Sequence, residues 1–230
     1  MSIRPITTVM EFDDVIRTRR SVHQYSDADI DDETLYDLFE DVRHAPSSFN
    51  LQPWEFLAVR GDDLERLRSV AYGQEHVTDA AAAVVVLGTL DPSDHAERVT
   101  NDLLEKGYLP NESAAEARLE TADNLADADA ETRRLWTTGS SALAAMTLMY
   151  AAWGRGIASC PMGGFDAEAL HDEFDVPDDY EAVMLVTLGY PEDGAADLER
   201  PRKFRRPPDE FLHLDEFDPV ARESATPADD

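Results

Sequence analysis

The chain has 230 residues, 43% of them hydrophobic, and a formal net charge of −29 at pH 7. So large a negative charge opposes binding to nucleic acid or anionic membranes, and no apolar stretch is long enough to cross a bilayer. The single cysteine, Cys160, excludes an internal disulfide, so we expect one domain over residues 1–230 with its own hydrophobic core.

Helical and strand-like patterns alternate in the first part of the chain. Apolar residues recur at helical spacing near Phe12 and again from Leu35, which follows an acidic stretch at 31–33. Short apolar runs indicate strands. We expect helices at about 12–16, 35–42 and 62–70, and strands at 54–59 and 83–87. This alternation indicates a domain that combines helices with a sheet.

Residues 91–132 are polar and rich in Ala, Asp and Glu, with helix-forming residues throughout. Gly107, Pro110 and Asn111 interrupt the pattern near its middle. We therefore expect two exposed helices, which together would form a lid.

Residues 135–153 are the longest apolar segment, and their apolar side chains cover more than one helical face. We expect a helix that is buried on nearly all sides, either as the spine of the domain or as the seam of a dimer. Gly154 and Gly156 would end it.

The remainder of the chain predicts a turn at Pro161–Phe165, a helix from Asp166 and a buried strand at 183–188. Beyond them, residues 214–230 form an acidic tail. We expect this tail to be disordered or to lie along another surface, because it cannot bury a core of its own.

Eight of the twenty basic residues lie in two short windows. The windows consist of Arg17, Arg19 and Arg20, and of Arg200, Arg202, Lys203, Arg205 and Arg206. If the fold brings the windows together, their guanidinium groups would form a fork of donors suited to a phosphate. The alternative is that each window only offsets nearby acids.

Neither of the common phosphate-binding loops is present. The sequence lacks G-x-x-x-x-G-K-[ST], and Gly154-Arg155-Gly156 follows a predicted helix rather than a strand. A phosphate would therefore be held by side chains. The Pro46–Trp54 loop, which offers hydroxyls and amides, and the Pro161–Phe165 turn would meet the rest of the ligand. Gly163-Gly164 permits close approach of a flat ring, although an ordinary turn before a helix would also contain such residues.

Four motifs, in this order along the chain, resemble those of the FMN-dependent nitroreductase family. They are Arg19-Arg20-Ser21-Val22-His23-Gln24-Tyr25, Ala45-Pro46-Ser47-Ser48-Phe49-Asn50-Leu51-Gln52-Pro53-Trp54, Pro161-Met162-Gly163-Gly164-Phe165 and Leu188-Gly189-Tyr190-Pro191. The resemblance spans about Val15 to His213. It implies an α+β fold with a central mixed or antiparallel sheet flanked by helices, in an intertwined homodimer that binds two FMN molecules between its subunits.

The resemblance also implies how four segments share the cofactor. The arginine-serine segment would hold the FMN phosphate and ribityl chain, and the proline-serine loop would come from the other subunit. The Gly-Gly segment would place backbone N–H groups against the flavin ring near N5, and the late basic residues would complete the phosphate site. The cofactor-binding residues that the resemblance implies are Arg19, Arg20, Ser21, His23, Pro46, Ser47, Ser48, Asn50, Gln52, Pro161, Met162, Gly163, Gly164, Lys203, Arg205 and Arg206.

The chain departs from the family pattern at His23, where arginine or lysine is usual. A neutral imidazole contributes one donor and little charge near pH 7. We still place His23 near the phosphate, and we expect Arg206 to compensate for the missing charge.

The function that the resemblance implies is flavin chemistry. FMN would take hydride from NADH or NADPH, and the reduced ring would pass two electrons to a small aromatic, quinone or nitro-type acceptor in a ping-pong mechanism. No catalytic side chain is expected, and Cys160 should be buried and inert. The same fold also supports reductive dehalogenation, enal reduction and flavin breakdown. A non-catalytic, flavin-binding redox-sensing dimer is the alternative from another functional class.

The remaining expectations concern environment and metals. Eighteen arginines and two lysines face 49 acids, a balance that is typical of proteins from salt-in halophiles, where salt screens the repulsion between carboxylates. The N-terminus has no apolar region before a cleavage site, so we expect a cytoplasmic protein. The six histidines lack a spacing such as H-E-x-x-H, and no protein metal site is expected.

Overall fold

The computed structural model describes residues 10–217, so most of the expected acidic tail, from residue 218 on, lies outside the described residues. The chain divides into two units, residues 1–199 and residues 200–230. Within the described part, no helix is both long enough and apolar enough to cross a membrane.

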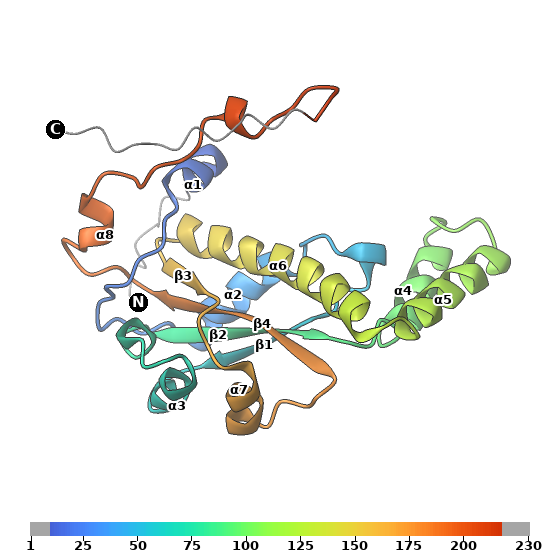
Figure 1. Cartoon of the computed structure of the whole chain (residues 1–230), viewed down its shortest axis with the longest axis horizontal. Helices are drawn as coiled ribbons and strands as arrows, with labels where there is room; N and C mark the ends of the chain where they lie inside the picture. The colour runs from blue at the N-terminus through green and yellow to red at the C-terminus, as the bar shows by residue number, and fades with distance from the viewer. Residues whose placement is uncertain (1–9, 218–230) are drawn as a thin grey trace, which may run out of the picture. The chain divides into compact units, whose positions relative to one another are not determined.

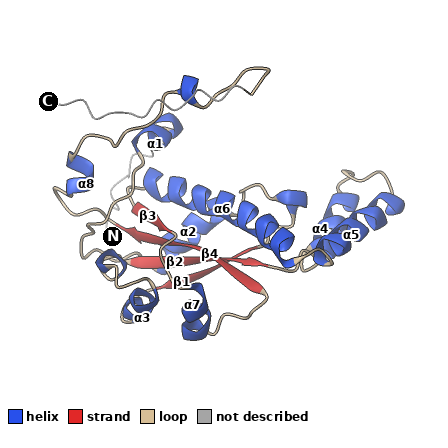
Figure 2. Cartoon of the chain, in the orientation of Figure 1, coloured by secondary structure: helices blue, strands red, loops and turns tan. Residues whose placement is uncertain are grey.

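One antiparallel sheet forms the centre of the first unit (Figure 2). Its strands are β1 (Trp54–Val59), β2 (Ala82–Thr89), β3 (Ala158–Met162) and β4 (Tyr180–Gly189). Their spatial order is β1-β2-β4-β3, and each neighbouring pair is antiparallel. The helices of this unit are α1 (Phe12–Thr18), α2 (Asp32–Val42), α3 (Asp63–Val70), α4 (Ala96–Glu105), α5 (Glu112–Ala126), α6 (Ala130–Gly154), α7 (Ala167–Phe174) and α8 (Ala196–Glu199). The expected α+β fold is therefore confirmed.

The two faces of the sheet bury alternate residues of the same strands, because successive side chains of a strand point to opposite faces. Val84 and Val86 of β2 belong to a core with α2 and α6, whereas Val85 and Leu87 belong to a second core with α3 and α7. Figure 1 shows α6 on one side of the sheet and α3 and α7 on the other. All eight residues of β2 are buried, which explains its continuous apolar sequence.

Four of the helices begin at an Asp or Asn whose side chain accepts a hydrogen bond from the backbone three residues further on. The N–H groups of Thr34, Ala114, Thr132 and Ala169 donate to Asp31, Asn111, Asp129 and Asp166, over 2.8, 3.0, 2.8 and 3.1 Å. Each such cap stabilises a helix by about 1 kcal/mol. These caps fix the starts of α2, α5, α6 and α7.

The connection after α6 differs from the prediction. We expected a short link and a turn at Pro161–Phe165, but Cys160, Pro161 and Met162 belong to strand β3. This strand lies at the edge of the four-stranded sheet, where β4 is its neighbouring strand, and an edge is where a strand tolerates proline. Gly163 and Gly164 then leave the sheet before α7. The prediction of Cys160 as a buried residue is confirmed, since it is 5% exposed.

The two predicted helices within residues 91–132 are present as α4 and α5, which pack against each other (Figure 1). The expected burial of α6 on nearly all sides is wrong for the single chain. Leu135 and Leu143 are 68% and 49% exposed, while Ala144, Ala145 and Leu148 are buried against the sheet. One apolar face of α6 is therefore uncovered within one chain.

The second unit is described over residues 200–217 and contains one short 3-10 helix, Pro208–Glu210. Arg205 Nη1 donates to the carbonyls of Lys203 and Phe204 over 3.3 and 2.9 Å. The guanidinium of Arg206 lies 5.5 Å from the centre of the Phe211 ring.

Candidate functional site

The Pro46–Trp54 loop has a backbone that is unusual for its sequence. Phe49, Asn50 and Gln52 have φ angles of 54°, 54° and 49°, in the left-handed region that favours glycine. Such conformations cost about 1–3 kcal/mol each and persist where the surrounding structure enforces them. The Gln52 N–H donates to Ser47 Oγ over 3.0 Å, and the Ser48 N–H donates to Ser140 Oγ of α6 over 3.3 Å. The loop is therefore held in a strained shape with its polar residues at the surface.

Helix α5 also holds this loop. Arg118 donates to the backbone carbonyl of Phe49, and its guanidinium lies 5.6 Å from the centre of the Phe49 ring. The helix that we expected to act as a lid thus contacts the loop that we expected to contact a cofactor.

A second predicted segment, Arg19–His23, lies along strand β3. Ser21 pairs in parallel with Ser159, and the Val22 N–H donates to the Ser159 carbonyl over 3.2 Å. Since β3 contains Pro161 and Met162 and is followed by Gly163 and Gly164, the fold brings two of the predicted cofactor-binding segments together. Arg20 Nη1 donates to the Asp197 carbonyl over 2.8 Å.

His23 is held on both sides of its ring. Its Nδ1 lies 2.8 Å from Asp197 Oδ2, which also accepts the His23 backbone N–H over 3.0 Å. Its Nε2 lies 3.4 Å from Cys160 Sγ. The imidazole therefore points into the chain, toward a carboxylate and a thiol.

His76, in the 3-10 turn Glu75–Val77, completes this cluster. Its ring packs edge-on against His23 with centroids 4.8 Å apart, and its Nε2 lies 3.2 Å from Met162 Sδ. Burial lowers the pKa of His76 below its usual value, and the nearby His23 ring lowers it further. Sequence reasoning missed His76 and Asp197, because no local motif marks either residue.

The Gly163-Gly164 segment presents an open backbone surface. A Cβ atom added at Gly163 would meet no atom within 4 Å, and both glycines are exposed. The Gln74 side chain donates to the Gly164 carbonyl over 2.8 Å and fixes the segment from one side. Gln74 is another residue that the sequence did not single out. A flat ligand could approach the backbone at Gly163 directly.

The Arg19–His23 segment and the Pro46–Trp54 loop lie near different ends of α6. Thr18, next to the Arg19–His23 segment, accepts a hydrogen bond from Trp153, whereas Ser48 contacts Ser140. At a rise of about 1.5 Å per residue, Ser140 and Trp153 are about 20 Å apart along the helix. In Figure 1 the loop lies near α4 and α5, whereas α1, which precedes Arg19, lies near the other end of α6. One chain does not bring these two surfaces together.

The late basic residues lie in the second unit. Lys203, Arg205 and Arg206 are all exposed there. Their expected meeting with Arg19 at a phosphate remains a prediction.

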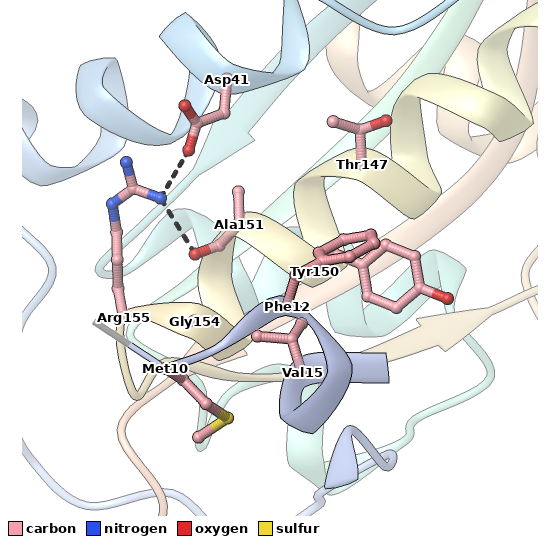
Figure 3. A pocket seen from close by; sticks show the side chains of 9 residues that line it. All are labelled: Met10, Phe12, Val15, Asp41, Thr147, Tyr150, Ala151, Gly154 and Arg155. Atoms are coloured by element: carbon pink, nitrogen blue, oxygen red, sulfur yellow. Dashed lines mark hydrogen bonds and ion pairs between the residues drawn. The ribbon is translucent and has the colours of Figure 1, made fainter. Parts of the chain in front are cut away.

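An apolar cavity of about 540 Å³ lies elsewhere, between α1 and α6. Figure 3 shows the Phe12 and Tyr150 rings on its wall, 6.1 Å apart, and an Arg155–Asp41 ion pair of 2.6 Å at its rim. None of the predicted cofactor-binding residues lines this cavity. It marks apolar surface that a single chain leaves open.

The chain is similar to known proteins over most of its length. The family model described as the nitroreductase family matches residues 16–190. YodC and MhqN of Bacillus subtilis (strain 168), whose names place them provisionally among the NAD(P)H nitroreductases, are 34% and 32% identical to the chain. These alignments cover 76% and 88% of this chain and 87% and 98% of the relatives.

A solved structure of similar fold contains a cofactor. It is a provisionally named nitroreductase from Exiguobacterium sibiricum 255-15 in complex with FMN, and it is 26% identical with a TM-score of 0.79. The match covers 90% of this chain and 98% of that one. The region matched by the family model includes Arg19–His23, Pro46–Gln52 and Pro161–Gly164 and ends before Lys203.

Proposed function

The chain belongs to the nitroreductase family, and from this premise we propose that it is an FMN-dependent oxidoreductase. It takes hydride from NADH or NADPH and passes two electrons to a small aromatic, quinone or nitro-type acceptor. The observation that carries the proposal is the parallel pairing of Ser21 with Ser159. The segment that contains Arg19 and Arg20 runs along β3, and Gly163 directly follows the end of this strand at Met162.

The residues on this surface fit FMN in shape and charge. Arg19 and Arg20 offer guanidinium donors to a phosphate, and such charge-assisted hydrogen bonds are among the strongest in proteins. The open backbone at Gly163 accommodates the face of an aromatic ring. The Ser21 hydroxyl lies on the same segment and offers a further donor. This combination of cations, hydroxyl and uncovered glycine suits a phosphorylated flat ligand.

His23 has a different part in this proposal from the two arginines. Its Nδ1 is paired with Asp197 and its Nε2 faces Cys160, so a phosphate contact would require the His23–Asp197 pair to break. A carboxylate so close also repels a phosphate. We assign the phosphate to Arg19 and Arg20, and we place His23 at the margin of the site.

We propose that the site is shared between two subunits. The Pro46–Gln52 loop and the Arg19–His23 segment are separated by about 20 Å along α6 in one chain. A second copy that contributes its own loop would complete the site. The exposed apolar side chains of Phe12, Ile16 and Leu143 give such a homodimer a surface to bury.

The cofactor and the protein chain have different roles in this proposal. Bound FMN would supply the hydride and electron transfer, which is why no catalytic side chain is needed. The chain binds the phosphate, orients the ring against Gly163 and Gly164 through backbone donors, and restricts water with α4 and α5. Donor and acceptor use the same surface in turn, which gives ping-pong kinetics.

The test measures NAD(P)H oxidation by the purified protein in high salt with a panel of electron acceptors. NADH and NADPH are each paired with a nitroaromatic, a quinone, an enal and a halogenated aromatic. We expect FMN-dependent NAD(P)H oxidation with at least one nitroaromatic or quinone, and parallel double-reciprocal lines. Rapid flavin reduction without turnover of any acceptor would favour the redox-sensing alternative.

A further inference from the structure

Three side chains with metal-ligating atoms converge beside β3. They come from distant parts of the sequence: His23, His76 and Cys160. One ring nitrogen of each histidine and the Cys160 sulfur all lie within 4.8 Å of one another. The two imidazoles are partly exposed while the thiol is buried. An ion could therefore enter from solvent between the two rings and reach the buried sulfur.

The distances are close to those of a bound ion. A tetrahedral zinc site with Zn–S of about 2.3 Å and Zn–N of about 2.0–2.1 Å separates its sulfur and nitrogen ligands by about 3.6 Å. Cys160 Sγ and His23 Nε2 are 3.4 Å apart. The widest separation in the cluster, at most 4.8 Å, needs to shorten by about 1 Å, which a rotation of the partly exposed His76 ring would provide.

The surroundings orient His23 as a ligand. Metal-binding histidines almost always donate their other ring N–H to a carboxylate or carbonyl, which fixes the tautomer and leaves the ligating nitrogen free of a proton. Asp197 Oδ2 lies 2.8 Å from His23 Nδ1 and also accepts the His23 backbone N–H. The imidazole is thereby held with Nε2 directed at Cys160.

We propose that His23, His76 and Cys160 form a binding site for a transition-metal ion of thiolate and imidazole preference, with Zn²⁺ as the ion of choice. The donor set excludes Mg²⁺ and Ca²⁺, which require oxygen ligands. Met162, whose Sδ lies 3.2 Å from His76 Nε2, offers a thioether at the edge of the site. This inference goes beyond the proposed flavin chemistry and does not depend on it.

The site borders the surface proposed for FMN, because Met162 directly precedes Gly163. A metal ion here would bring positive charge to the edge of that surface. Metal binding and FMN binding are therefore measured separately, so that failure of one leaves the other interpretable.

The experiment uses the full-length protein as purified, in molar KCl with excess Mg²⁺ to occupy the acidic surface. Zn²⁺ is titrated in competition with a chromophoric chelator, and retained zinc is measured by elemental analysis after gel filtration. We expect one equivalent per chain in the wild type. Stoichiometric binding should be lost in Cys160→Ala and His76→Gln and kept in His44→Gln, a control at an exposed histidine outside the cluster.

Two further measurements separate a metal site from a folding effect. Asp197→Asn should weaken Zn²⁺ about 10- to 100-fold, as expected for a carboxylate that orients a ligating histidine. Co²⁺ should give thiolate charge-transfer absorption in the wild type but not in Cys160→Ala, with circular dichroism showing that the variant is folded. Equal Zn²⁺ affinity in the wild type and in folded Cys160→Ala and His76→Gln, or no stoichiometric binding, would overturn the proposal.

Discussion

Replacing Gly163 by alanine separates the folding role of this residue from its proposed ligand role. In the chain alone, the added Cβ would meet nothing within 4 Å, and the residue does not require a positive φ. A Gly→Ala change at a compatible position stabilises a protein by about 0.4–1 kcal/mol, because it restricts the unfolded chain. Gly163→Ala should therefore fold at least as stably as the wild type.

The effect on FMN should be the opposite. If the flavin ring packs against the Gly163 backbone, the new methyl group occupies space that the ring needs, and overpacking of this kind costs about 1–3 kcal/mol. Since every 1.4 kcal/mol is tenfold in affinity, FMN should bind about 5- to 150-fold more weakly. The assay is quenching of FMN fluorescence by apoprotein, alongside thermal unfolding without FMN. Unchanged FMN affinity, or a large loss of stability in the apoprotein, would refute the reasoning.

The remaining predictions concern the phosphate, the shared site and the core. Arg19→Ala should weaken FMN binding by about 1.5–3 kcal/mol through loss of a charge-assisted hydrogen bond. The control is Arg17→Ala, at an exposed residue paired with Asp13 over 3.3 Å, which should change the FMN dissociation constant little. Equal effects of the two substitutions would contradict the assignment. Coexpressed Arg19→Ala and Asn50→Ala chains should regain about one quarter of wild-type activity. Random pairing makes about half of the dimers mixed, and each mixed dimer holds one intact site of its two. No recovery in a confirmed mixed dimer would place each site in one chain. Gly88→Ala should lower the free energy of unfolding by about 1–3 kcal/mol, since its Cβ would lie 2.2 Å from Thr137 Oγ1 and 2.7 Å from Ser141 Oγ; an unchanged urea midpoint would contradict the packing of α6 on β2.

The sequence predicts most of the framework where local pattern and tertiary environment agree. Residues 54–59 were expected as a strand and form β1 with the same bounds, and the acidic stretch at 31–33 contains the Asp31 cap of α2. Strand β3 was missed because it is short, contains Pro161 and owes its conformation to pairing with β4 rather than to a periodic pattern.

The candidate site was only partly accessible to sequence reasoning. The motifs identified the Arg19–His23, Pro46–Gln52 and Pro161–Gly164 segments, but they could not show that Phe49, a non-glycine residue, adopts a positive φ. The convergence of His23, His76 and Cys160 depends on contacts between residues far apart in the chain. Such clusters have no local signature, so only the fold reveals them.

The central claim, that this is an FMN oxidoreductase, is tested most directly by an anaerobic reduction and reoxidation experiment. The purified protein, reconstituted with FMN, is mixed with one equivalent of NADH or NADPH while its flavin absorption is recorded, and a quinone or nitroaromatic is then added. We predict that the yellow absorption bleaches with the pyridine nucleotide and returns stoichiometrically with the acceptor. A protein that retains no FMN after reconstitution, or whose bound flavin neither nucleotide reduces, would contradict the claim.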